Sequence, residues 1–340
     1  MLLLCSSVIA CKKAQDNAPV TATATDSKSL NINITVAQDG SGNYTTVQAA
    51  INAVPDNSSS RTVIYIKNGT YKEVITVPST KQNVSLVGQS STGVKLTYDN
   101  YASKINPATG AAYGTAGSAS TFIKGVGFFA QNIIFENAAG PVGQALAISV
   151  LADKAVFYYC RFLGRQDTWY GSNIRAYLKN CYIEGTTDFI FGSATAFFDG
   201  CSIYSYGGTA LTAANTNSYV TYGLVFNNCT VTGASGVSTY LGRTWGPYAA
   251  TAFVNSSLSS IIQPAGWNDW GNSANDATAR YNEYGNTGAG ASRTSRVSWS
   301  HLLTSAQAAN YTSYKTVLKT TYATSPVTDN WDPTLVINNP

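Results

Sequence analysis

Two aspartates in the middle of the chain, Asp167 and Asp188, lie 21 residues apart among apolar and aromatic residues. Two carboxyl groups held a few ångströms apart cannot both ionise easily. One is then expected to stay protonated and act as an acid, while the other acts as a nucleophile or a base. The pair could carry such chemistry if the fold brings the two side chains together.

Two glutamines and one arginine could complete such a site. Gln144 and Gln166 lie 22 residues apart, and Arg243 stands in the segment LGRTWGPYA. Side-chain amides can donate hydrogen bonds to an oxyanion, and a guanidinium beside a carboxyl group favours its ionised form. A carboxylate nucleophile, a carboxylic acid and an amide oxyanion hole together predict acyl transfer.

Other chemistries fit the sequence poorly. The only histidine is His301, which precedes a predicted helix, and there is no G-x-S-x-G elbow. No cluster of ligand residues predicts a metal site, and no P-loop or dinucleotide motif predicts a cofactor. One structural alternative stays open, because Asp167 and Asp188 could simply cap the turns of a repeating fold.

A repeat explains how residues 21 positions apart can meet. Cys160, Cys181 and Cys201 are separated by 21 and 20 residues, and Cys229 follows after 28. Each cysteine precedes an alternating strand, so one repeat corresponds to one coil of a β-solenoid. Residues one period apart then stack on parallel strands about 4.8 Å apart.

The predicted fold class is therefore all-β, a right-handed single-stranded parallel β-helix with short flanking helices at residues 46–54 and 304–313. We expect the cysteines to form one inward column and the aspartates another column on the outer surface. Buried cysteines can serve as small apolar residues, but Cys181 and Cys201 could also form a disulfide in an oxidising compartment.

The composition is typical of a turn-rich β protein outside the cytoplasm. Hydrophobic residues make up 44% of the chain and charged residues only 11%, with 29 glycines and 22 tyrosines. The net charge of +4 is compatible with an anionic substrate, but no basic run indicates nucleic-acid binding.

The N-terminus predicts export. Residues 1–11 resemble a secretory signal that ends in a possible bacterial lipobox at Cys11, and residues 12–30 read as a flexible tether. The folded domain is expected to span residues 31–340. The protein would then be extracytoplasmic, either secreted or attached to a bacterial outer membrane or cell surface through a lipidated Cys11.

Ordered sequence blocks along residues 31–335 resemble the pectin methylesterases of carbohydrate esterase family eight. The domain opens with VAQDGSGNYTTVQAAINAVP, and the blocks that follow are NGTYKE, GQALAI, GRQDTWYG, TTDFIFG and LGRTW. Five blocks in one order are far more specific than a single motif. The resemblance implies a pectinesterase, a carboxylic ester hydrolase that converts methylated pectin to pectate and methanol without a cofactor.

Carried over position by position, the resemblance implies a role for each candidate residue. Asp188 would attack the galacturonate methyl ester, and Asp167 would protonate the departing methanol and then act as a base on water. Gln144 and Gln166 would stabilise the oxyanion. Arg243 would hold Asp188 ionised.

The resemblance also implies a long groove in which aromatic side chains bind the sugar chain. The matching positions, for which ordinary packing is the alternative, are Tyr170, Phe191, Trp245 and Trp267. Three residues depart from the family pattern: Arg165 and Trp169 beside the QDT core, and Thr244 in place of the usual proline. Arg165 could contact a free galacturonate carboxylate or face solvent.

Three alternative functions stay open. A lipid-anchored relative could act on a different ester or thioester, and a non-catalytic β-helix could bind carbohydrate. A paired-carboxylate glycosidase would cleave the polymer and release reducing ends. A monomer is expected, because β-helices with capped ends are usually monomers.

Overall fold

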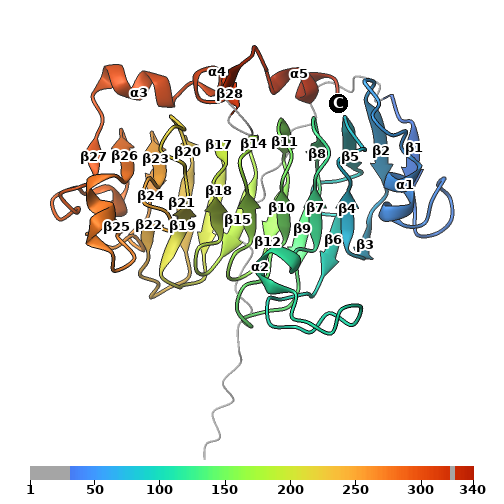
Figure 1. Cartoon of the computed structure of the whole chain (residues 1–340), viewed down its shortest axis with the longest axis horizontal. Helices are drawn as coiled ribbons and strands as arrows, with labels where there is room; N and C mark the ends of the chain where they lie inside the picture. Colours follow the sequence, from blue (N-terminus) through green and yellow to red (C-terminus); the bar gives the residue numbers. More distant parts are fainter. Residues whose placement is uncertain (1–30, 322–325) are drawn as a thin grey trace, which may run out of the picture.

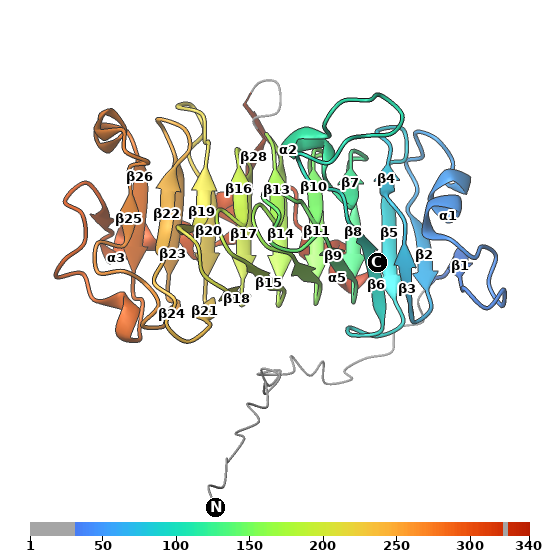
Figure 2. The same ribbon diagram turned by 90° about the horizontal axis from the view of Figure 1, so that it is seen from below.

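The short strands expected from the repeat wind into a parallel β-helix. The computed structural model describes residues 31–321 and 326–340, so the signal segment at 1–11, its Cys11 and the tether at 12–30 lie outside the described residues. Three parallel sheets run along the molecule, and successive coils add one strand to each sheet (Figures 1 and 2). The predicted all-β fold class is confirmed.

The three long sheets are called A, B and C. The strands of sheet A are, in spatial order, β1 (Ile34–Val36), β2 (Thr62–Ile66), β5 (Val84–Gly88), β8 (Phe129–Gln131), β11 (Ala155–Tyr158), β14 (Arg175–Lys179), β17 (Thr195–Asp199), β20 (Leu224–Asn227), β23 (Ala250–Val254), β26 (Arg280–Tyr284) and β27 (His301–Leu302). Those of sheet B are β3 (Gly69–Lys72), β6 (Val94–Tyr98), β9 (Ile134–Asn137), β12 (Arg161–Leu163), β15 (Tyr182–Gly185), β18 (Ser202–Ser205), β21 (Thr230–Gly233) and β24 (Ser257–Leu258). Those of sheet C are β4 (Ile75–Val77), β7 (Thr121–Ile123), β10 (Ile148–Val150), β13 (Trp169–Gly171), β16 (Ile190–Gly192), β19 (Ala210–Ala214), β22 (Tyr240–Thr244) and β25 (Trp267–Asn268).

Short helices and one hairpin accompany the sheets. The helices are α1 (Val47–Ala53), α2 (Gly114–Gly117), α3 (Ser305–Tyr311), α4 (Tyr314–Val317) and α5 (Thr334–Asn338), with 3₁₀ turns η1 (Ser273–Ala277) and η2 (Ala289–Ala291) and the antiparallel strands β28 (Thr320–Thr321) and β29 (Val327–Thr328). Helices α1 and α3 are the two that the sequence predicts. Each begins at a threonine cap, because the hydroxyls of Thr46 and Thr304 accept hydrogen bonds from the first turn.

Single asparagines turn the chain at the corner between sheets A and B. Asn180, Asn228 and Asn255 follow β14, β20 and β23, with φ angles of 51°, 55° and 50°. Asparagine tolerates this left-handed conformation because its short polar side chain can form local hydrogen bonds. The asparagine that recurs before a strand in the sequence therefore marks one corner of a coil.

The interior between the sheets holds the cysteine column. Cys160, Cys181, Cys201 and Cys229 are all buried and free. Each thiol donates to a backbone carbonyl from an earlier coil, for example Cys201 Sγ to the oxygen of Leu178 at 3.3 Å. The inward column is as predicted, but the disulfide between Cys181 and Cys201 is not formed. The thiols pack as small apolar groups instead.

The C-terminal segment covers the outer face of sheet A. It runs back along the β-helix as α3, α4 and α5 (Figure 1). Apolar side chains such as Val317, Leu318 and Trp331 pack there against Tyr177 and Phe197 of the sheet. This leaves sheet C, on another side of the β-helix, open for a binding site. No helix in the described ranges has the length and apolar character to cross a bilayer.

Candidate active site

The two aspartates lie side by side at the corner between sheets B and C. Asp167 precedes β13 and Asp188 precedes β16, and these strands pair in register. The amide of Asp167 donates to the carbonyl of Thr187 at 3.2 Å, and the amide of Asp188 donates to that of Ala210 at 2.8 Å. The two buried carboxyl groups therefore occupy equivalent positions in successive coils, as the repeat predicts.

This corner has a backbone that only some residues can adopt. Asp167 and Asp188 have φ angles of 66° and 53°, in the left-handed region where aspartate is enriched. Gly185 precedes the second aspartate by three positions, and a Cβ there would lie 2.2 Å from the Cβ of Phe189. The glycine permits the tight turn that presents Asp188.

Arg243 binds one of the two aspartates through two hydrogen bonds from a single edge of its guanidinium. Its Nε donates to Asp188 Oδ1 at 2.8 Å, and its Nη2 donates to Oδ2 at 2.5 Å. Arg243 lies in β22, two strands away from β16 in sheet C. A planar guanidinium matches the two carboxylate oxygens in this fork, and such bidentate pairs are among the strong charge-assisted hydrogen bonds.

The surroundings give the two carboxyl groups different proton affinities. Burial raises the pKa of Asp167 to about 8, and the charge of Asp188 adds to this rise while Arg243 opposes it. Burial also raises the pKa of Asp188 above its usual range, although the hydrogen bonds and the charge of Arg243 oppose this rise. The geometry therefore favours a protonated Asp167 beside an ionised Asp188 at neutral pH.

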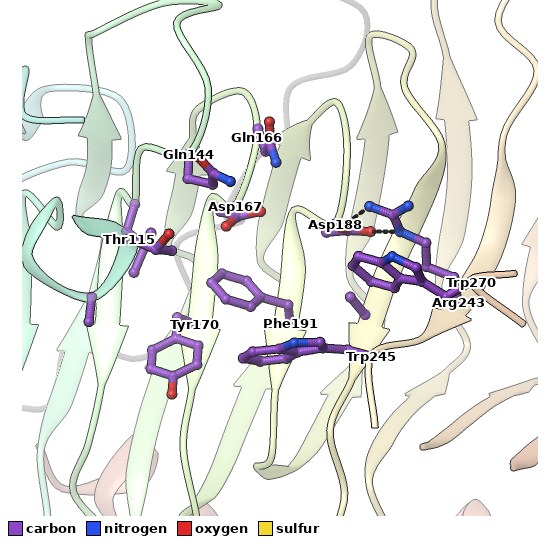
Figure 3. Close-up of a pocket in the computed structure, with 13 residues that line it drawn as sticks. Thr115, Gln144, Gln166, Asp167, Tyr170, Asp188, Phe191, Arg243, Trp245 and Trp270 are labelled. Carbon is purple, nitrogen blue, oxygen red and sulfur yellow. Dashed lines mark hydrogen bonds and ion pairs between the residues drawn. The ribbon is translucent and has the colours of Figure 1, made fainter. Parts of the chain in front are cut away.

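The two glutamines lie next to this pair. Gln144 and Gln166 face each other across a parallel β-bridge, and the amide of Ala145 donates to the carbonyl of Gln166 at 3.2 Å. Figure 3 shows both side chains on the same side of Asp167. Two neutral amides beside a carboxyl pair are placed to donate to an oxyanion.

These residues line a pocket of about 430 Å³ on sheet C. One side is polar and the other is aromatic (Figure 3). The lining consists of Thr115, Ala116, Gln144, Leu146, Gln166, Asp167, Tyr170, Asp188, Phe191, Ala213, Arg243, Trp245 and Trp270. The structure therefore brings together all five candidate catalytic residues.

Three of the four predicted aromatic residues form the apolar side of the pocket. Tyr170 and Phe191 are register partners on β13 and β16, with ring centroids 4.8 Å apart. The ring of Trp245 lies 5.8 Å from that of Phe191 and is 45% exposed. Trp245 and Tyr170 thus offer accessible faces, while Phe191 is buried between them and the strands.

The prediction for Trp267 is wrong. Its side chain is only 1% exposed, stacks on Tyr281 in the interior at 4.3 Å between ring centroids, and donates from Nε1 to Glu283 at 3.1 Å. A sugar cannot reach it there. Trp270, three residues later, lines the pocket instead and was missed. Both tryptophans occur in the short segment WNDW, and the repeat gives no sign of which one faces outward.

Thr115 was also missed, because it lies in α2, within a long connection between β6 and β7 that follows no repeat. In residues 31–321 and 326–340, no three histidine, cysteine, aspartate or glutamate side chains are grouped to hold a metal ion. His301 is exposed in β27 of sheet A, away from the strands of sheet C that form the pocket.

Comparison with known proteins identifies the family. Residues 33–320 match the family model described as Pectinesterase. This chain belongs to the pectinesterase family. It is 41% identical over 285 residues to pectinesterase 31 of Arabidopsis thaliana, which covers 82% of this chain and 90% of that relative. The expected class of enzyme, a carboxylic ester hydrolase, is confirmed.

Solved pectin methylesterases have the same fold. The enzyme from carrot superposes with a TM-score of 0.80 at 34% identity, over 86% of this chain and 95% of that chain. A pectin methylesterase in complex with a hexasaccharide gives 0.75 at 30% identity, over 89% of this chain and 98% of that one. The chain spans only 49% of the length of the probable pectinesterase/pectinesterase inhibitor 13 of Arabidopsis thaliana.

The structure places the three departures from the usual pectinesterase pattern. Trp169 is buried in the interior, and Arg165 lies over the ring of Tyr206 with its Cζ 4.1 Å from the ring centroid. Thr244 is buried, and its hydroxyl donates to the carbonyl of Asp269 at 2.8 Å. None of the three replaces a pocket residue.

Proposed function

We propose that this pectinesterase hydrolyses the galacturonate methyl esters of pectin, giving pectate and methanol, with Asp188 as the nucleophile and Asp167 as the acid and base. One observation carries the assignment: Arg243 donates two hydrogen bonds to the carboxyl group of Asp188, and none to that of Asp167, which lies one coil away. The site therefore holds one ionised and one neutral carboxyl group. That division is what acyl transfer by a carboxylate requires.

In the first half of the reaction, an Asp188 oxygen attacks the ester carbonyl carbon. The carbonyl oxygen becomes negative, and the amides of Gln144 and Gln166 donate hydrogen bonds to it. When the carbon–oxygen bond to the methoxy group breaks, Asp167 gives its proton to the leaving oxygen. Methanol departs, and an anhydride links Asp188 to the sugar.

In the second half, Asp167 is ionised and takes a proton from a water molecule. The resulting hydroxide attacks the anhydride carbonyl, and the same two glutamines stabilise the second oxyanion. Asp188 leaves as a carboxylate that Arg243 holds in place. The cycle returns a proton to Asp167 and forms galacturonic acid, whose carboxyl group releases its remaining proton to solvent, so atoms and protons balance.

The aromatic side of the pocket supports a sugar-binding role for Tyr170, Phe191 and Trp245. Sugar rings present C–H groups that pack on aromatic faces, and Trp245 and Tyr170 have such faces open to the pocket. Thr115, which belongs to α2, closes the pocket on the side away from Trp245 (Figure 3).

The test is methanol release from highly methylated pectin, measured beside the formation of reducing ends. Methanol without new reducing ends is the expected result. New reducing ends would indicate cleavage of the polymer instead. A folded protein that releases no methanol would shift the assignment to another ester or thioester, or to carbohydrate binding without catalysis.

We also propose that the enzyme acts outside the cytoplasm, because pectin is a cell-wall polymer. Residues 1–11 support export, with Cys11 as a lipid attachment site, and residues 12–30 would tether a folded domain of residues 31–340 to a bacterial surface. Mass spectrometry of the protein from membrane and soluble fractions tests this. A lipid mass on Cys11, lost in Cys11→Ala, is expected; an unmodified soluble protein would contradict it.

A further inference from the structure

Trp270 covers the arginine that holds the proposed nucleophile. The Cζ of Arg243 lies 3.5 Å from the centre of the Trp270 ring, so the guanidinium rests against the indole (Figure 3). Trp270 also lines the pocket and is 42% exposed. We propose that Trp270 is a positioning residue, whose indole face keeps the guanidinium of Arg243 aligned with Asp188 and shielded from water. The proposal rests on the assignment of Asp188 as the nucleophile.

The geometry of Arg243 shows why it needs such a support. Its two hydrogen bonds to Asp188 fix one edge of the guanidinium, but they leave the flat faces uncovered. Water on an open face would compete for the N–H groups and would screen the charge pair. An aromatic ring attracts a cation over its face and excludes water from that side. Trp270 therefore strengthens the pair that keeps Asp188 ionised.

The backbone at Trp270 indicates that this placement is maintained against strain. Its φ is 60°, in the left-handed region that bulky side chains rarely occupy. Such conformations persist only where surrounding contacts fix them, and they concentrate at functional sites. Here the amide of Trp270 donates to Asn268 Oδ1 at 2.9 Å, and Asn268 is the register partner of Arg243 on β25.

A second set of contacts ties the same loop to the strand of Arg243. Thr244, the next residue in β22, donates from its hydroxyl to the carbonyl of Asp269 at 2.8 Å. The same hydroxyl accepts from Asn275 Nδ2 at 2.9 Å. Both ends of the loop that presents Trp270 are therefore anchored beside Arg243. Thr244, which departs from the usual family residue, takes part in this anchoring.

Trp245 provides a matched control. It is about as exposed as Trp270 and lines the same pocket, but it packs against Phe191 on the sugar-binding side. Replacing Trp245 by leucine is expected to raise KM, because a sugar platform is lost. It should not move the acid limb of the pH profile, which is the fall in activity at low pH, because Trp245 does not contact the guanidinium of Arg243 that binds Asp188.

The decisive experiment measures kcat and KM against pH for Trp270→Leu, Trp270→Phe and Trp245→Leu. For Trp270→Leu we expect kcat to fall about 3- to 30-fold, the range of a cation–π contact, with KM changed less than about twofold. The acid limb should move to higher pH by about 0.5–1 unit, because Asp188 loses part of the support for its charge. Trp270→Phe, which keeps a ring, should recover most of the loss.

The opposite pattern for Trp270→Leu overturns the proposal. A raised KM with an unchanged kcat and acid limb would make Trp270 a sugar platform like Trp245.

The pair Thr244→Val and Thr244→Ser gives a second test that leaves Trp270 itself in place. Valine, which cannot hold the loop, should shift the acid limb in the same direction, and serine should not. Equal profiles for the two would contradict the anchoring role.

A readout without turnover separates this proposal from the proposed function. The carboxyl carbon of Asp188 can be titrated by NMR in protein with ¹³C-labelled aspartate, with the signal assigned through Asp188→Asn. A higher Asp188 pKa in Trp270→Leu than in the wild type supports positioning, even if the wild type releases no methanol from pectin. Identical titration curves would overturn it, even if the wild type is an active pectinesterase.

Discussion

Asp167 and Asp188 have the same side chain, the same left-handed backbone and nearly the same burial, yet their surroundings give them different tasks. Desolvation disfavours the charge on both. Only Asp188 accepts the two hydrogen bonds from Arg243, so the positive charge of the guanidinium stabilises the ionised form of this carboxyl group most. A neighbouring negative charge then makes ionisation of the other still less favourable. Identity of residue type therefore says little about role at this site.

Asp188→Asn tests the nucleophile assignment. Asparagine has almost the same shape and can still accept one of the two hydrogen bonds from Arg243, but its amide oxygen is a poor nucleophile. We expect kcat for methanol release to fall about 10³-fold or more, as when other hydrolases lose a nucleophile, with an unchanged circular dichroism spectrum. Asp56→Asn, at an exposed aspartate that pairs with Lys81, is the control and should keep full activity. Substantial turnover by Asp188→Asn would exclude it as the nucleophile.

The raised pKa of Asp167 predicts an alkaline limit to activity. The proposed acid must carry its proton when methanol leaves, and burial and the charge of Asp188 hold that proton up to about pH 8. Raising the pH through this value removes it, so kcat/KM should fall about tenfold per pH unit above about 8. A pH profile on methylated pectin measures this. A kcat/KM that stays level up to pH 10 would contradict the assignment of Asp167 as the acid.

At the scale of the elements, the coil explains what could be predicted from the sequence. The period of the repeat places Asp167 beside Asp188, because one period is one step between hydrogen-bonded strands. The same regularity predicts the cysteine column and the bridge between Gln144 and Gln166. The period of the repeat predicts which residues are neighbours on adjacent coils, and this was enough to predict that these residues lie together.

Direction and distant contacts could not be predicted in the same way. Trp267 turns into the interior from β25, while Trp270 lies in the loop after this strand and lines the pocket, and the residue type gives no sign of which tryptophan faces inward. Thr115 comes from a connection outside the repeat. Arg175 and Asp329, which contact each other, lie 154 residues apart in the sequence, so no local sequence pattern predicts their contact.

Arg175 joins the C-terminal segment to sheet A. Its side chain is 1% exposed and forms ion pairs with Asp153 at 2.7 Å and Asp329 at 2.6 Å. Its Nη1 also donates to the carbonyl of Leu318 at 3.0 Å, and Trp331 lies over the guanidinium. A buried cation needs these partners, because removing one leaves charge uncompensated in a poorly hydrated place.

Asp329→Ala should therefore destabilise the protein without changing catalysis. We expect the free energy of unfolding to fall by about 1.5–3 kcal/mol, the range for a hydrogen bond to a charged group. Urea denaturation measures the change, and kcat should stay the same because the pocket lies on sheet C. Lys315→Ala removes the ion pair between an exposed lysine and Asp332 in the same segment and should lower the stability much less, because solvent screens the charge of the lysine. Equal losses of stability in the two variants would indicate that the contact between Asp329 and Arg175 has no special role in holding the C-terminal segment.

At the scale of the whole molecule, a solenoid must close its two ends. Each end of a β-helix exposes the interior and the unpaired edges of strands, which can pair with another chain. Helix α1 lies at the N-terminal end and packs Val47, Ala50 and Ile51 against the core (Figure 2). At the other end, the segment after β26 places Val297 and Trp299 against the same core. Both covers consist of elements outside the repeat.

These covers predict a monomer, and Ile51→Asp tests the reason. Light scattering of the wild type should give the mass of one chain at all concentrations. A charge at Ile51 cannot be buried without a large cost, so α1 should detach and expose the edge strands β1 and β4. We expect this variant to associate into dimers or larger species as its concentration rises. Ala53→Asp, on the exposed side of α1, should stay monomeric. A wild type that dimerises, or an Ile51→Asp variant that is folded and monomeric, would show that α1 does not keep the chains apart.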